Sequence, residues 1–72
     1  MKDKRMLFFE NMQALEFSVY YMKYWNMIVE AKYHYYTMIA LLMGAYANDE
    51  ITGHEFLIFD DYLSDVYNEL FK

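Results

Sequence analysis

The stretch SVYYMKYWNMIVEAKYHYY, residues 18–36, holds six of the nine tyrosines and the only tryptophan of this 72-residue chain. Asn26 lies near its middle. The fold depends on whether one helix runs through Asn26 or whether the chain turns there. Proline is absent and the first glycine is Gly44, so no residue in positions 3–47 obliges a helix to end.

Apolar residues recur every three or four positions along this region, which is the spacing of one face of a helix. This seam comprises Phe8, Met12, Leu15, Val19, Met22, Asn26, Val29, Tyr33, Tyr36, Ala40, Met43 and Ala47. Polar residues keep the same phase on the opposite face from Glu10 to Thr37. The pattern favours one long helix over about residues 3–47, with a break near residues 25–26 as the alternative.

A turn and a further helix follow this region. Asn48 and Asp49 suit a left-handed turn that ends a helix. Thr52 and Glu55 have the spacing of a capping box, in which each side chain accepts a hydrogen bond from an otherwise unpaired backbone amide. The apolar residues beyond the box recur at helical spacing: Phe56, Phe59, Leu63, Val66 and Leu70. A helix is predicted over about residues 53–71.

These elements predict a single all-α domain spanning residues 1–72, either a helical hairpin or a three-helix bundle. A helix over residues 3–47 would be about 68 Å long at 1.5 Å per residue, whereas a compact chain of this size has a radius of gyration of about 11 Å. The shorter helix would cover less than half of it, so the hairpin needs a second copy and predicts a homodimer. Three helices would have similar lengths, but residues 25–26 contain no glycine, proline or turn-forming pair.

The composition also predicts association. Hydrophobic residues, tyrosine included, make up 58% of the chain and aromatic residues 22%, against roughly 45–50% apolar residues in an average soluble domain on a count that leaves out tyrosine but includes glycine. At its seam position, Asn26 would fix the register of a dimer by pairing with the partner's amide, unless it marks a helix break or faces solvent. The residues expected to mediate self-association or partner binding are Tyr20, Tyr21, Tyr24, Trp25, Asn26, Tyr33, Tyr35 and Tyr36.

The net charge of −5 is concentrated in the last third of the chain, where seven carboxylates from Asp49 onward face Lys72 alone. The carboxylates expected to form a partner-binding face on the last helix are Glu55, Asp60, Asp61, Asp65 and Glu69. Such a face suits docking to a basic protein surface, including a phosphate-binding site where carboxylates stand in for a DNA backbone. The simpler interpretation is a solvated face that keeps an apolar protein in solution.

Several function classes are disfavoured. The chain has no cysteine, no glycine-rich phosphate loop and no serine in a nucleophile turn, so we expect neither an enzyme nor a cofactor or metal site. The acidic balance argues against direct binding of nucleic acid. The apolar runs, of which Tyr33–Ala47 is the longest, are too short for a membrane span, and Met6–Phe9 is too short for a signal peptide.

We therefore expect a small acidic helical protein–protein interaction protein in the cytoplasm. It would act as a regulator or inhibitor that occupies a basic surface of its partner, in the narrowest version as a DNA mimic on a nucleic-acid-binding protein. The alternative is a structural or assembly module that self-associates through its aromatic-rich helix, with the acidic face serving only solubility.

Overall fold

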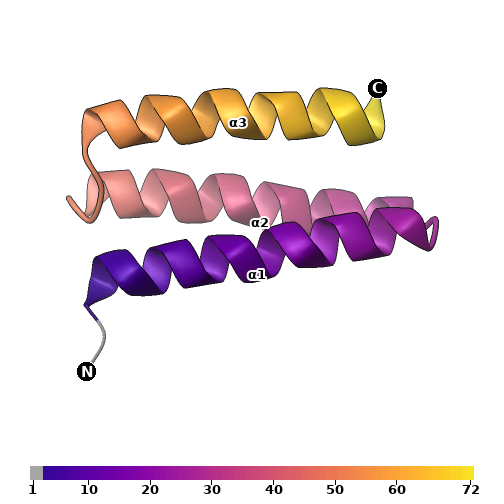
Figure 1. Ribbon diagram of the computed structural model, residues 1–72, viewed down its shortest axis with the longest axis horizontal. Coiled ribbons are helices and arrows are strands. Elements are labelled where there is room, and N and C mark those ends of the chain that lie inside the picture. The colour runs from indigo at the N-terminus through magenta and orange to yellow at the C-terminus, as the bar shows by residue number, and fades with distance from the viewer. Residues whose placement is uncertain (1–2) are drawn as a thin grey trace.

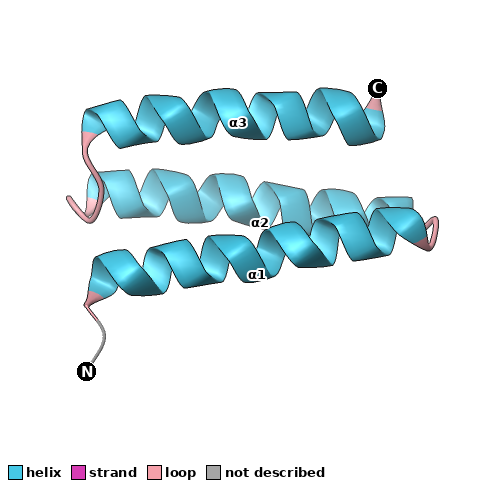
Figure 2. Cartoon of the chain, in the orientation of Figure 1, coloured by secondary structure: helices cyan, strands magenta, loops and turns pink. Residues whose placement is uncertain are grey.

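The computed structural model describes residues 3–72, and its secondary structure in that range consists of three α-helices (Figure 2). These are α1 (Lys4–Tyr24), α2 (Ile28–Ala47) and α3 (Gly53–Phe71). The all-α class is confirmed. The prediction of one uninterrupted helix over residues 3–47 is wrong, because the chain breaks near residues 25–26 as in the three-helix alternative.

Consecutive helices run in opposite directions, with α2 between α1 and α3 and set back from both (Figure 1). The Cα atoms extend over 35 × 26 × 13 Å. Their radius of gyration is 12.4 Å, against about 11 Å for a compact chain of this length. The molecule is therefore a flattened bundle, in which α2 has neighbours on two sides.

The break between α1 and α2 is a Schellman turn centred on Asn26. Its backbone has a φ of 61°, in the left-handed region that asparagine enters more readily than most other non-glycine residues. The Met27 N–H donates to the Met22 carbonyl over 2.8 Å, and the Asn26 N–H donates to the Lys23 carbonyl over 3.0 Å. These two bonds satisfy carbonyl groups that the end of α1 would otherwise leave unpaired.

The turn between α2 and α3 repeats this motif. Asp49 has a φ of 58°, the Glu50 N–H donates to the Ala45 carbonyl over 2.8 Å, and the Asp49 N–H donates to the Tyr46 carbonyl over 3.1 Å. The predicted left-handed turn after Asn48 is therefore confirmed. One residue with positive φ was enough to end a helix in both places, without glycine or proline.

The turn at Asn26 changes which face of the chain is buried. On α1 the predicted seam is correct, since Phe8, Met12 and Val19 are buried. On α2 it is wrong, because the buried side chains belong to a different face: Ala31, Tyr35, Met38, Leu42 and Ala45. The residues predicted for the α2 part of the seam are all exposed: Val29, Tyr33, Tyr36, Ala40, Met43 and Ala47. A continuous helix would have kept the two faces in phase, whereas the turn lets α2 pack with the opposite face.

The core lies where the three helices meet, and α3 contributes Leu63 and Val66 to it, on the apolar face that the sequence predicts. Aromatic rings connect the helices. The Phe59 ring on α3 packs edge-on against Phe8 of α1, with 5.3 Å between ring centroids. The Tyr35 hydroxyl of α2 donates a 2.9 Å hydrogen bond to the Leu63 carbonyl of α3.

Candidate interaction surfaces

The predicted aromatic binding residues divide into buried and exposed groups. Tyr35 is only 6% exposed, so this residue is corrected from the interface to the core. Tyr20 is half-buried and donates a 3.3 Å hydrogen bond to the Glu69 carboxylate of α3. Burial raises the pKa of both phenols above the ordinary value. Neither ring is free to bind a partner without disturbing the contacts between helices.

Tyr21, Tyr24 and Trp25 lie at the end of α1, where they form an exposed aromatic ladder with Phe17. The ring centroids of Phe17 and Tyr21 are 6.3 Å apart and those of Tyr21 and Trp25 are 6.4 Å apart. Tyr24 packs edge-on against Trp25 at 5.3 Å and is 80% exposed. The ladder follows the four-residue spacing of one helix face.

Asn26 is exposed in the turn and belongs to neither helix. This corrects the prediction that it occupies a seam position of a continuous helix and sets the register of a dimer there. Its structural role is the left-handed backbone conformation described above. The sequence contained that signal, because asparagine is one of the few residues suited to such a turn.

Tyr33 and Tyr36, the remaining predicted rings, lie on the solvent side of α2. They belong to a continuous face that we call the α2 outer stripe: Val29, Tyr33, Tyr36, Ala40, Met43 and Ala47. The stripe lies opposite the buried face of the helix by its 100° spacing per residue. None of its six residues is charged, and Lys32 lies at its margin, one turn before Tyr36.

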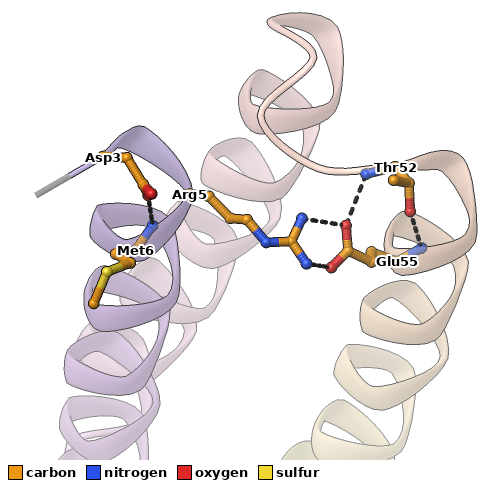
Figure 3. A network of polar contacts seen from close by, with 5 residues as sticks. All are labelled: Asp3, Arg5, Met6, Thr52 and Glu55. Carbon is orange, nitrogen blue, oxygen red and sulfur yellow. Dashed lines mark hydrogen bonds and ion pairs between the residues drawn. The ribbon is translucent and has the colours of Figure 1, made fainter.

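The predicted acidic face is also divided. Glu55 forms an ion pair with Arg5 of α1 and accepts a 2.9 Å hydrogen bond from the Thr52 N–H, which confirms the capping box (Figure 3). Glu69 accepts the hydrogen bond from Tyr20. Both carboxylates therefore lie toward α1 and hold α1 and α3 together.

Asp60, Asp61 and Asp65 are exposed, and no ion pair or hydrogen bond involves their side chains within residues 3–72. Asp61 and Asp65 lie one helical turn apart, about 5–6 Å between Cβ atoms. Leu57 and Ile58 are 62% and 54% exposed at the preceding turn. These four residues, Leu57, Ile58, Asp61 and Asp65, define the α3 outer face.

Leu57 and Ile58 are the residues that the sequence analysis missed on this face. Their signal was available, because positions 57, 58, 61 and 65 share one side of a helix while the apolar stripe occupies the other. The face therefore combines an aliphatic pair with carboxylates.

A shallow hollow of about 300 Å³ lies between α1 and α3, with Phe9, Phe59 and Glu16 among its lining residues. Glu16 accepts a hydrogen bond from the Tyr62 hydroxyl, and burial together with this bond raises the pKa of Tyr62.

In residues 3–72 we find no cluster of three or more acidic or histidine side chains that could hold a metal ion. None of the helices in that range is long and apolar enough to cross a membrane.

We expect the Arg5–Glu55 pair to make stability depend on pH at the acidic end. The Arg5 guanidinium, together with hydrogen bonds from Thr52, lowers the pKa of Glu55 from 4.5 to about 2. The stabilisation is therefore complete above the unfolded value of 4.5 and is lost as the pH falls toward 2. In Arg5→Gln we expect the Glu55 pKa to move up toward 4.5, as followed by carboxyl-carbon NMR.

The matched control is Lys4→Gln, which removes the same charge from the neighbouring exposed position. It should leave the Glu55 pKa near 2. An unchanged Glu55 pKa in Arg5→Gln would show that the ion pair does not persist in solution.

Comparison with known proteins adds no relative, since no protein-family model, no curated protein and no solved structure matches the chain.

Proposed function

We propose that this chain is a protein–protein interaction protein that binds a basic partner through the α3 outer face, and so acts as a regulator or inhibitor of that partner. The observation that carries the proposal is the unpaired state of Asp61 and Asp65 beside the exposed Leu57 and Ile58. Apolar side chains with charged neighbours are the usual composition of an interface centre and its rim.

The electrostatics of α3 support a basic partner. Its only positively chargeable residue besides the terminal Lys72 is His54, in the first turn of the helix. Among the described residues, Glu55 pairs with the Arg5 cation and Glu69 accepts a hydrogen bond from the neutral Tyr20 hydroxyl, both on the side toward α1. Asp61 and Asp65 keep their charge available for a partner. In the narrower form of this proposal the partner is a nucleic-acid-binding protein. Two of the five predicted carboxylates, Glu55 and Glu69, are engaged within the chain and do not contribute to that contact.

The test uses the partner recovered from the native host by affinity purification. Asp61→Asn with Asp65→Asn should weaken binding by up to about 30-fold, since each exposed ion pair contributes at most about 1 kcal/mol. The salt dependence of the dissociation constant should also become shallower, because electrostatic contacts are screened. Isothermal titration at several salt concentrations measures both quantities.

The matched control is Glu30→Gln with Glu50→Gln, which removes two charges at positions outside α3. This control should bind with nearly the affinity of the wild type. Equal binding by the α3 variant and the wild type at every salt concentration would contradict the electrostatic part of the proposal.

A second candidate function is self-association, in which the chain acts as a homodimer or assembly module. The specific observation that favours it is the exposure of large rings on α1 and α2, including Phe17 and Tyr33 at 73% and 72%. Exposed apolar patches of this kind mark interaction sites in soluble proteins. Such association should be nearly independent of salt, which distinguishes it from docking through Asp61 and Asp65.

A further inference from the structure

The helix α2 has two apolar faces, and its neighbours cover only one. The buried face meets α1 and α3 in the core. The α2 outer stripe lies on the opposite side of the helix, away from the helices that flank it in Figure 1. An apolar helix face normally packs against another element, and polar residues of α2 such as Glu30 and Thr37 lie between its two apolar faces. In a single chain, one apolar face of α2 is therefore buried and the other stays in contact with solvent.

We infer that a second copy of this chain covers the α2 outer stripe, with the two α2 helices packed antiparallel about a two-fold axis between Tyr36 and Ala40. The inference rests on the self-association candidate and names the surface that performs it. In such an isologous contact the same stripe serves on both copies. The result would be a six-helix assembly in which both α2 helices are central.

The exposed area of the α2 outer stripe approaches the lower bound for a specific dimer. A full tyrosine buries roughly 150–250 Å², so the exposed parts of Tyr33 (72%) and Tyr36 (56%) amount to about 250 Å² per chain. The exposed parts of Val29 (77%) and Met43 (59%) add roughly 120 Å² of apolar area per chain. Two copies bring about 750 Å² from these residues, and the exposed small residues between them raise this toward the roughly 1,000 Å² of a specific interface.

The order of large and small residues favours the antiparallel arrangement. With the axis between Tyr36 and Ala40, each Tyr36 ring faces Ala40 of the other copy, and each Tyr33 faces Met43. A parallel pair would place Tyr36 against Tyr36 and Ala40 against Ala40. The two large rings would clash, and the two small side chains would leave a gap. It would also bring the two Glu30 carboxylates to the same end, whereas the antiparallel pair separates them and opposes the helix dipoles.

Small residues allow the two helices to approach closely. Ala40 lies in the stripe and Gly44 lies beside it, one turn further along. A Cβ atom at Gly44 would meet nothing within 4 Å in the isolated chain. The space over this part of α2 is therefore open to a second backbone.

The first test places a charge at the centre of the stripe. Ala40→Glu should raise the dimer dissociation constant at least about 100-fold, because a carboxylate buried without a partner typically costs several kcal/mol. Asn68→Glu on the exposed side of α3 makes the same change in charge and should keep the wild-type constant. Sedimentation equilibrium measures both constants, and circular dichroism should show the same helix content in both variants, since both sites are exposed in one chain.

The second test uses the absence of cysteine from the chain. Ala40→Cys treated with a short bifunctional thiol reagent should give a covalent dimer, and Asn68→Cys should not. A wild type that stays monomeric would overturn this inference together with self-association, and would leave binding through α3 intact. A dimer that survives Ala40→Glu, with no cross-linking of Ala40→Cys, would overturn this inference alone and assign self-association to another surface.

Discussion

Leu63→Ala is expected to remove most of the stability of the fold. Leu63 is fully buried on α3, and its carbonyl accepts the hydrogen bond from the Tyr35 hydroxyl of α2. Truncating a buried leucine typically costs about 2–5 kcal/mol, and a single core in a chain this small supplies about 3–5 kcal/mol. Urea denaturation followed by circular dichroism should therefore show a strongly lowered midpoint or an unfolded chain.

Leu57→Ala is the matched control, because it makes the same substitution on the exposed side of the same helix. Its effect should stay within about 0.5 kcal/mol. Equal destabilisation by the two substitutions would mean that Leu57 is buried as deeply as Leu63, which would contradict the packing of α3 described above.

Asn26→Leu is expected to change the architecture. Leucine pays about 1–2 kcal/mol in the left-handed conformation that Asn26 adopts, whereas it is a strong helix former. The variant should therefore favour a continuous helix through the α1–α2 turn, about 66 Å long over residues 4–47 at 1.5 Å per residue. A chain opened in this way exposes its core and can bury it by exchanging helices with a second copy.

Small-angle scattering measures this change. Asn26→Leu should give a longer maximum dimension than the wild type, because its continuous helix of about 66 Å exceeds the 35 Å over which the Cα atoms of one wild-type chain extend. Asn26→Gly is the control, because glycine adopts positive φ without strain and should keep the wild-type scattering curve. A wild-type curve for Asn26→Leu would show that packing alone, without the turn residue, determines the break.

The sequence predicted the helical class, the capping box at Thr52 and Glu55, and the apolar face of α3, because each depends on residues close together in the chain. It gave the break near residues 25–26 only as the alternative to one long helix. Residues 25–26 contain no glycine, proline or turn-forming pair, and one asparagine with positive φ and two Schellman hydrogen bonds were sufficient to end the helix. The face of α2 that is buried depends on how the helices pack across the turn. The spacing of apolar residues alone does not predict it.

The interaction surfaces were predictable only in part. The sequence predicted aromatic and acidic residues for these surfaces, but the exposed or engaged state of each depends on contacts over many positions. Tyr35 became a core residue through its bond to Leu63, and Glu55 became a structural residue through Arg5. These contacts join residues 28 and 50 positions apart, so no local pattern contains them.

Two exposed surfaces carry the proposals made for this chain. Its two turns fold three helices into a flattened bundle, and the central helix is left with an apolar face in solvent. The α3 outer face carries charge for one kind of contact, and the α2 outer stripe offers apolar area for another. The two proposals use different helices and respond differently to salt, so each can fail without the other.

The central claim is that one copy of this chain cannot cover its own apolar surface. Light scattering coupled to size-exclusion chromatography, across the micromolar range and at high salt, measures it most directly. The account predicts a molar mass of twice the 8.9 kDa of one chain, unchanged by salt. A mass of 8.9 kDa at every concentration, from a fully helical protein, would contradict it.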